Sequence, residues 1–490
     1  MYFSRYNLTI PLDRYPEHVI LHNIFHGQVS LLSAEFAERI RRAMMGDGGA
    51  LTPSEIKRLK DRYFLYDSED EEETLINKLY SGFCGTLAST NPTRQYQILL
   101  TYDCNLRCTY CFQKKTRNSA TMGLDQLNRV LALISRIDGD IQAEARERSL
   151  RIKPALISIV GGEPMQDSAP FRELVTRAAR FAKENRIAYC FTTNGVDLRR
   201  FVPLFASVGC LPNDIQVTLD GTRAIHDRRR PKAGGGDSFD EIIEGIGLAL
   251  QAGIHISLRV NLDNQNIDCI EELAELIVAK GWNRQPKFSP YLAPVTDHSG
   301  VNLNYKWMAA GTLLIETIAG KFQRQPQLSS VFEVKNFRGF NHVKDIVENR
   351  GLPTPTFWRC EAILGQLIFD PLGDIYTCFE GAGNEDAKVG SYEPEFRLDA
   401  ERLAAWKGLN SYDSRPCAGC RYKFLCAGGC PWRIIHKGET ECLPIEREIQ
   451  LAWNFFADKI IERLGAAQPC PVDAVAGQPI PHGGNSAVST

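Results

Sequence analysis

The sequence predicts an α/β fold built around a parallel sheet, and two observations support this class. From residue 96 onward, short β-rich runs alternate with amphipathic helical stretches, giving about six βα units in roughly 200 residues. Each strand is followed at once by a polar or glycine cluster, and parallel α/β folds place their active sites at the carboxyl ends of the strands. The clusters therefore predict one site on one rim of either a doubly wound sheet or a barrel.

The expected elements of this region follow from period-two and helical patterning between turn signals. The strands are Tyr96 to Tyr102, Ala155 to Val160, Ala188 to Thr192, Ile215 to Leu219, Ile254 to Val260 and Lys287 to Tyr291. The helices between them include Leu124 to Ile137, Phe171 to Asn185, Phe239 to Ala252 and Ile270 to Lys280.

Residues 1–95 lack the βα alternation and instead predict a small winged-helix-like module. Val19 to Leu21 and Val29 to Leu32 form an expected hairpin, and a helix from Ala34 to Met45 follows it. Thr52-Pro53-Ser54-Glu55 has the pattern of a capping box with proline at the first helical position, and Thr74 to Tyr80 forms a further helix.

The rest of the chain divides into three further expected parts. Residues 301–357 form a bridging segment with a helix from Tyr305 to Lys321, and residues 358–445 carry most of the cysteines. The last part, 446–490, is expected to hold a helix and a disordered tail, because residues after Leu464 are rich in Pro, Gly and small side chains.

Composition sets limits on partners and compartment. The 490 residues are 43% apolar and 24% charged with a net charge of -2, so the overall balance attracts neither nucleic acid nor a membrane surface. No run of eighteen apolar residues occurs, and the N-terminus carries charges where a signal peptide needs an apolar stretch. We therefore expect a cytoplasmic protein.

Cysteine usage is the unusual feature. Three of the fifteen cysteines, Cys104, Cys108 and Cys111, follow the first strand of the α/β region within eight positions. In a reducing compartment such a cluster favours metal binding over disulfides. Structural zinc needs four ligands, whereas a cubane iron-sulfur cluster on three thiolates keeps one iron open. A zinc knuckle completed by a distant residue is the alternative.

The segment CNLRCTYC resembles the signature of radical S-adenosylmethionine (SAM) enzymes, and Gly161-Gly162-Glu163-Pro164 after the second strand resembles the family segment that receives the methionine amino group. The resemblance implies a partial (β/α)6 radical SAM barrel. It also implies that the three thiolates hold a catalytic 4Fe-4S cluster, whose open iron binds SAM for cleavage to a 5'-deoxyadenosyl radical.

The same resemblance implies roles for further residues. Tyr110 matches an aromatic position beside the adenine, and Gly161, Gly162 and Glu163 would contact the methionine part of SAM. Asn194, Asp220 and Arg259 match strand-end positions that face cofactor or substrate in relatives, with ordinary turn and rim residues as the alternative. His226 to Arg230 resembles a family loop, and is either a substrate contact or a solvated basic loop.

A second cysteine set resembles the SPASM extension of radical SAM enzymes, which carries two auxiliary clusters. Its pattern contains seven cysteines and one glycine, and a zinc ribbon is the alternative. By resemblance the outer cluster is held by Cys417, Cys420, Cys426 and Cys442, and the inner cluster by Cys360, Cys378 and Cys430. Two cubanes need eight thiolates, so one inner iron is open or is bound by a non-cysteine ligand or the substrate. The expected cofactors are thus SAM and three 4Fe-4S clusters.

SPASM relatives mostly modify peptides, and the N-terminal module resembles an element with which maturases grip a leader peptide through a sheet edge. The leading hypothesis is a peptide maturase that installs a carbon-carbon or thioether crosslink, or another oxidative change, in a ribosomally made precursor. An external donor such as flavodoxin or ferredoxin would supply electrons.

The alternative enzyme hypothesis is an anaerobic sulfatase-maturase activity that forms formylglycine. Those enzymes carry an aspartate base directly after the cysteine of the glycine-x4-cysteine element, whereas Cys378 is followed here by Phe379 and Glu380. Glu380 is the candidate base. A non-catalytic electron carrier has no need of a methionine-binding segment, and a zinc-dependent nucleic-acid binder is disfavoured by the charge balance.

Overall fold

The computed structural model describes residues 1–89, 94–150, 152–298, 311–348, 355–358, 360–438 and 440–465. The expected disordered tail beyond 465, with Cys470, lies outside the described residues, as does the beginning of the helix expected at Tyr305.

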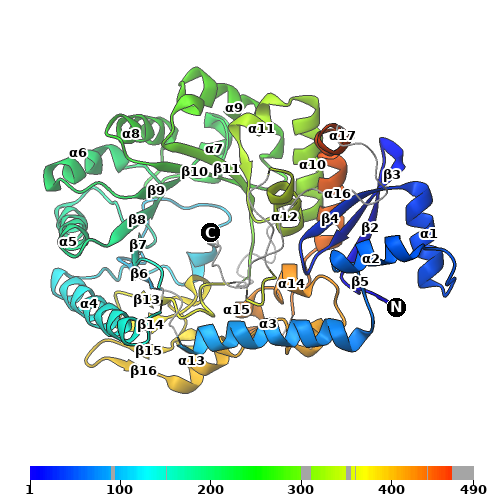
Figure 1. Ribbon diagram of the computed structural model, residues 1–490. Helices are drawn as coiled ribbons and strands as arrows, with labels where there is room; N and C mark the ends of the chain where they lie inside the picture. Colours follow the sequence, from blue (N-terminus) through cyan, green and yellow to red (C-terminus); the bar gives the residue numbers. More distant parts are fainter. Residues whose placement is uncertain are drawn as a thin grey trace.

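A single curved sheet forms the centre of the molecule (Figure 1). Its strand order is β12-β11-β10-β9-β8-β7-β6-β13-β14-β15-β16, and strands β6 to β11 are all parallel. These six consecutive strands confirm the predicted α/β class and the partial barrel. Their bounds are β6 Gln95–Leu99, β7 Leu156–Val160, β8 Ala188–Thr193, β9 Asp214–Thr218, β10 Ile256–Leu262 and β11 Phe288–Pro294.

The helices cover the outer face of this sheet, as Figure 1 shows for α4, α5, α6 and α8. They are α4 Leu124–Glu147, α5 Ala169–Asn185, α6 Leu198–Val208, α7 Arg223–Arg229, α8 Phe239–Gln251 and α9 Ile270–Ala279. Alternate strand residues such as Ile157, Ile215 and Leu258 are buried, whereas Ser158, Gln216 and Arg259 on the opposite face are only half-buried. The inner face of the sheet is therefore polar and partly open.

Two expectations for this region need correction at their boundaries. Strand β6 ends at Leu99 rather than Tyr102, because Tyr102 N–H donates to Ala120 O and Leu100 O accepts from Met122 N–H, so the chain turns to residues 120–122 after the strand. Helix α4 continues ten residues beyond Ile137, to Glu147, and buries Asp138 and Ala145 in that extension.

The N-terminal module contains an antiparallel three-stranded sheet, β2 Asn7–Leu12, β3 Tyr15–Asn23 and β4 Gln28–Ser33. The expected hairpin is β3-β4, and β2 is an additional strand. Three helices follow, α1 Ala34–Met44, α2 Pro53–Asp61 and α3 Glu69–Ser89, and the short β1 Tyr2–Phe3 pairs with β5 Leu65–Tyr66. Both hydrogen bonds of the Thr52 capping box form, and α3 is much longer than the stretch expected at 74–80.

This module packs against C-terminal parts of the chain. His22 of β3 lies between His342 of α12 (Arg338–Val347) and Trp453 of α16 (Ile445–Phe455), and all three side chains are buried. Tyr6, Phe25 and Phe424 form a second, aromatic contact. The remaining helices of this region are α10 Gly311–Arg324, α11 Gln327–Val331 and α17 Ala457–Gly465, with the short strand β12 Glu333–Val334.

The cysteine-rich region continues the central sheet. Strand β13 (Leu367–Phe369) pairs in parallel with β6, and β14 Asp374–Tyr376, β15 Gly390–Ser391 and β16 Arg397–Leu398 extend it in antiparallel fashion. Short helices α13 Ala400–Lys407, α14 Lys423–Cys426 and α15 Pro431–Lys437 follow. No described helix combines the length and apolar composition that crossing a membrane requires.

Candidate functional site

The loop after β6 carries Cys104, Cys108 and Cys111 at the carboxyl rim of the sheet. Burial raises the pKa of Cys104 to about 12, and the neighbouring Cys108 adds to this shift. Burial also raises the pKa of Cys108, to which Cys111 contributes. The thiols of Cys104 and Cys108 therefore resist ionisation unless a cation accompanies them, which is the setting of a thiolate-held metal cluster. This donor set fits the predicted SAM-binding cluster.

A second segment, residues 229–233, holds the backbone of this loop. Arg107 N–H donates to Pro231 O at 2.8 Å and Thr109 N–H donates to Arg229 O at 3.0 Å. Ala233 N–H in turn donates to Asn105 O at 2.8 Å. The cysteine loop is thus paired with residues that follow α7, more than a hundred positions away in the sequence.

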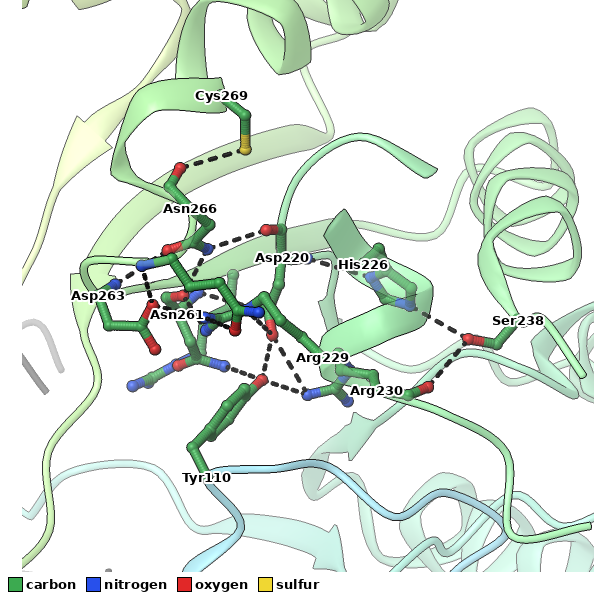
Figure 2. Close-up of polar contacts among 12 residues, drawn as sticks. Tyr110, Asp220, His226, Arg229, Arg230, Ser238, Asn261, Asp263, Asn266 and Cys269 are labelled. Carbon is green, nitrogen blue, oxygen red and sulfur yellow. Dashed lines mark hydrogen bonds and ion pairs between the residues drawn. The ribbon is translucent and has the colours of Figure 1, made fainter. Parts of the chain in front are cut away.

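Buried charges beneath the loop form the network shown in Figure 2. The Tyr110 hydroxyl donates to Asp220, and it accepts from Arg230 Nη1 at 2.6 Å and Asn261 Nδ2 at 3.1 Å. Arg229 places its guanidinium carbon 5.0 Å from the centre of the Tyr110 ring. Tyr110 and Asp220 are therefore brought together, and their roles toward SAM stay predictions.

Arg229 is fully buried between two carboxylates. It lies 2.5 Å from Asp263 Oδ1 and 3.6 Å from Asp220 Oδ2, and it donates to Asn261 O at 3.0 Å. Burial opposes ionisation of Asp220, but the charges of Arg229 and Arg230 outweigh it and lower the pKa of this carboxyl. The network is thus a fixed set of charges within the sheet rim.

The segment from His226 to Arg230 is mostly buried or half-buried, unlike the solvated basic loop that was one of the two expectations for it. His226 is buried, accepts from Asp220 N–H at 3.2 Å and contacts Ser238 Oγ at 3.2 Å. Asp227 accepts from the backbone N–H groups of Ser238 and Phe239 at the start of α8. Apart from the exposed Arg228, the segment ties α7 and α8 to the cysteine loop, and a contact with substrate stays a prediction.

Gly161 and Gly162 follow β7 and lie directly against the segment that leads into Cys104. Gly162 N–H donates to Thr101 O at 2.7 Å, and a Cβ at Gly162 would lie 2.1 Å from Asp103 O. A Cβ at Gly161 would lie 2.8 Å from Thr101 O. The close approach that requires glycine here is therefore to the chain's own backbone, and contact of this segment with SAM stays a prediction.

Glu163 is buried and joins the ends of β7 and β8. Its carboxylate accepts from Met165 N–H at 2.8 Å, Thr193 Oγ1 at 2.6 Å and Asn194 N–H at 2.6 Å. Burial nevertheless raises its pKa to about 7. Asn194 then reaches the cysteine loop, since its Nδ2 donates to Asn105 Oδ1 at 2.6 Å and lies 3.8 Å from Cys104 Sγ.

Arg259 lies on the inner face of the sheet, where its Nε donates to Asn261 Oδ1 at 2.6 Å. Sequence reasoning missed a second polar group near the start of these strands. Asp214 Oδ1 contacts His255 Nδ1 at 2.7 Å and accepts from Ser257 Oγ at 2.9 Å. Period-two alternation of polar residues in β9 and β10 is the signal that identifies this inner face.

The seven cysteines of the second set gather in two groups. Burial raises the pKa of Cys378, with contributions from Cys360 and Cys430, so these three thiols are neighbours. Burial also raises the pKa of Cys417, with contributions from the other thiols near it, Cys426, Cys420 and Cys442. This grouping matches the inner and outer sets that the resemblance implied, and their ligand roles stay predictions.

The inner group adjoins the cysteine loop of the barrel. The ring of Phe112, directly after Cys111, lies 5.5 Å from that of Phe379, directly after Cys378. The Tyr102 hydroxyl also donates to Asp370 Oδ2 at 2.7 Å across the β6-β13 junction. Glu380 lies beside Cys378, to whose sulfur its backbone N–H donates, and its role as a base stays a prediction.

His298 and Glu441 are further residues that sequence reasoning missed. His298 Nδ1 lies 3.3 Å from Glu441 Oε2, and one ligand atom from each, together with the Cys430 sulfur, lies within 4.8 Å of the others. An isolated histidine in a non-periodic segment gives no signal of this contact.

Comparison with known proteins identifies the α/β part. The radical SAM superfamily pattern matches residues 98–277. A serine-type anaerobic sulfatase-maturating enzyme of Klebsiella aerogenes is 24% identical over 356 residues, covering 69% of this chain and 79% of that enzyme.

Two solved structures share the fold. Native anSMEcpe with bound AdoMet aligns at a TM-score of 0.53 and 16% identity, covering 76% of this chain and 98% of that one. Streptococcus suis SuiB bound to precursor peptide SuiA aligns at 0.51 and 15% identity, covering 87% of this chain and 97% of that one.

Proposed function

We propose that this chain, which is a radical SAM enzyme by the domain that it carries over residues 98–277, is a maturase that crosslinks a ribosomally made peptide. The bond would be carbon-carbon or thioether, or the change another oxidative one. The observation that carries the proposal is the junction at which Phe112, beside the SAM-cluster cysteines, meets Phe379, beside the inner auxiliary cysteines.

The superfamily implies a 4Fe-4S cluster and SAM, which together supply a hydrogen-abstracting radical when bound. We assign the cluster to Cys104, Cys108 and Cys111. Pairing of this loop with residues 229–233 and the buried charges of Asp220, Arg229 and Arg230 fix its position. Tyr110 is oriented by the same charges, so the residues expected to meet SAM are held in place before it binds.

Two auxiliary clusters on the inner and outer cysteine groups complete the proposal. Forming a crosslink removes two hydrogen atoms from the peptide. One would pass to the 5'-deoxyadenosyl radical, and the other would leave as a proton and an electron that an auxiliary cluster could accept. An external flavodoxin or ferredoxin would supply the electron that cleaves SAM, and reduced clusters of this kind fit the cytoplasm. The radical step requires only the cluster that binds SAM, so the inner and outer cysteine groups favour a reaction with a further electron-transfer step.

The N-terminal module is the proposed site of the leader peptide. Strand β4 pairs with β3 alone among the described strands, so its other edge offers backbone N–H and C=O groups to an extended chain. The β2 edge is less suitable, because Asn454 of α16 contacts the backbone of Asp13 and Pro11 there. SuiB, whose structure holds precursor peptide SuiA, covers more of this chain than anSMEcpe does.

A formylglycine-forming activity is the second candidate, favoured by the alignment with the sulfatase-maturating enzyme over 69% of this chain. The residues after Cys378 argue against it, since Phe379 and Glu380 stand where the aspartate base is expected. A product aldehyde would react with a hydrazide probe, whereas a crosslinked peptide would not.

The test is anaerobic co-expression with the peptide encoded by a short reading frame beside the gene, followed by mass spectrometry. The control is the variant with Cys104, Cys108 and Cys111 all changed to Ala. We expect wild type alone to yield a peptide lighter by one pair of hydrogens. An unchanged peptide with SAM still cleaved would refute the substrate class, and iron-replete protein that does not cleave SAM would refute the radical reaction.

A further inference from the structure

The inner cysteine group offers three thiols, whereas each of the four irons of a cubane needs a ligand from outside the cluster. The structure describes four further cysteines, Cys84, Cys190, Cys210 and Cys269, and two of them have other partners. Cys190 contacts Ser158 inside the barrel at 3.2 Å, and Cys269 donates to Asn266 O at 3.1 Å. A side chain of another residue type would complete the ligand set.

His298 lies at the required place. Its imidazole interacts with the Cys430 thiol, and its ligand nitrogen lies within 4.8 Å of both the Cys430 sulfur and a Glu441 oxygen. The side chains of His298 and Glu441 are 20% and 27% exposed. One cysteine of the inner group thus lies beside both an imidazole and a carboxylate.

Backbone contacts bring together the three segments that carry His298, Cys430 and Glu441. Val295 N–H donates to Leu262 O at 2.8 Å, which extends the β10-β11 ladder and fixes the chain just before His298. Gly429 has φ +84°, and a Cβ there would lie 2.3 Å from Glu441 O. Glycine therefore allows the backbone before Cys430 to contact the backbone that carries Glu441.

We propose that His298 is the fourth protein ligand of the inner auxiliary cluster, on the iron that Cys360, Cys378 and Cys430 leave open. The proposal rests on the auxiliary clusters of the proposed function. Imidazole replaces thiolate on iron-sulfur centres of the Rieske type, whereas carboxylates favour harder ions. Glu441 is then a positioning residue that orients the imidazole through a hydrogen bond.

The experiment uses full-length protein with Cys104, Cys108 and Cys111 changed to Ala, so that only auxiliary clusters remain. Iron and sulfide are counted, and the reduced protein is measured by pulsed electron paramagnetic resonance with unlabelled and ¹⁵N-histidine. We expect about eight irons per chain and a strong histidine nitrogen coupling that changes with the isotope. This labelling reports on any histidine that binds an auxiliary cluster while His298 itself is unchanged.

Variants then assign the signal. His298→Ala should lose the coupling, and His298→Cys should lose it and shift the reduction potential of one cluster downward, because thiolate carries more negative charge than imidazole. His436→Ala is the matched control, since this histidine follows Cys430 on α15 but packs on Trp432 at 3.9 Å, and it should retain the coupling.

The outcomes separate the two proposals. About eight irons with no histidine coupling, or with a coupling that His298→Ala retains, would overturn the ligand assignment and leave the auxiliary clusters standing. Protein that binds zinc at Cys430 in place of iron, or about four irons per chain, would overturn the ligand assignment together with the pair of auxiliary clusters.

Discussion

The cysteine loop of the barrel and the cysteine-rich region near the C-terminus share one rim but are built differently. In the barrel, three thiols lie within a span of eight residues in the loop after β6. Ion pairs among the buried Arg229, Arg230 and Asp220 stabilise this loop. In the second region, seven thiols spread over residues 360–442 on turns, strands of two or three residues and helices of eight or fewer. We infer that protein contacts form the first site, whereas bound metal is needed to complete the second.

Removing iron is the strongest way to test this difference. Chelation of the wild-type protein should accelerate backbone amide exchange in residues 411–438 by more than about a hundredfold, because these turns and short helices lack the strand pairing that ties β13 to β16 to the central sheet. Peptides spanning 94–150 should change far less. Hydrogen exchange followed by mass spectrometry measures both, and equal acceleration of the two regions would show that the loop also depends on its metal.

Arg229→Met tests whether protein charges brace the loop. The change leaves the buried Asp263 and Asp220 carboxylates without their closest cation, so we expect a loss of about 3–5 kcal/mol in the free energy of unfolding. Arg228→Met is the control, since Arg228 is exposed. Denaturant unfolding of cluster-free protein provides the measurement, and similar values for both variants would refute a bracing role.

Acid should weaken the contact between the N-terminal module and the C-terminal helices. Trp453 Nε1 donates to His22 Nδ1 at 3.3 Å, so His22 Nε2 carries the proton shared with His342 Nε2 at 3.0 Å. Burial lowers the pKa of His342 to about 4 and that of His22 well below its usual value. Both imidazoles are therefore neutral in the folded protein.

Because the folded pKa values are depressed, the stability that these imidazoles contribute is present above about pH 6.5 and is lost as the pH falls toward 4. Within that window the loss is about 1.4 kcal/mol per pH unit for each imidazole. Unfolding measured at pH 7 and pH 5.5 should show this slope for wild type and a shallower one for the double variant His22→Asn, His342→Asn. Equal slopes would contradict the assignment.

Gly162→Ala should produce the smallest effect on stability. The added methyl group would overlap Asp103 O and push the segment before Cys104, at a cost of about 1–3 kcal/mol. Gly247→Ala is the control, because a Cβ at that position of α8 meets nothing within 4 Å. Iron content and SAM cleavage should fall only in Gly162→Ala, and a variant with both intact would show that the loop tolerates displacement.

The predictable features were those encoded locally. Alternating strand and helix patterns predict the six parallel strands, and the spacing of Cys417, Cys420 and Cys426 predicts a cysteine group that the structure also brings together. The burial of His226, Arg229 and Arg230 could not be predicted, because their partners, among them Ser238, Asp263 and Asp220, lie outside the segment. A charged run with distant partners has the same local pattern as a solvated one.

The contact of His298 with Cys430 also could not be predicted. It depends on where β11 ends relative to a turn more than a hundred residues later, and no periodicity links the two. The sequence predicts that Gly161 and Gly162 contact SAM. The structure shows in addition that the absence of a side chain at Gly162 leaves room for Asp103 O.

Helix α3 runs from the N-terminal module along the cysteine-rich region (Figure 1). Tyr80 donates to Asp413 Oδ2 at 2.5 Å, and Tyr412 donates to Asn77, so this helix holds the two parts at a set separation. A peptide anchored on β4 would then reach the rim only through a fixed span of chain. The residue to be modified would then be set by its distance along the peptide from the leader. Each residue inserted between the leader and that position would move the modification by one position.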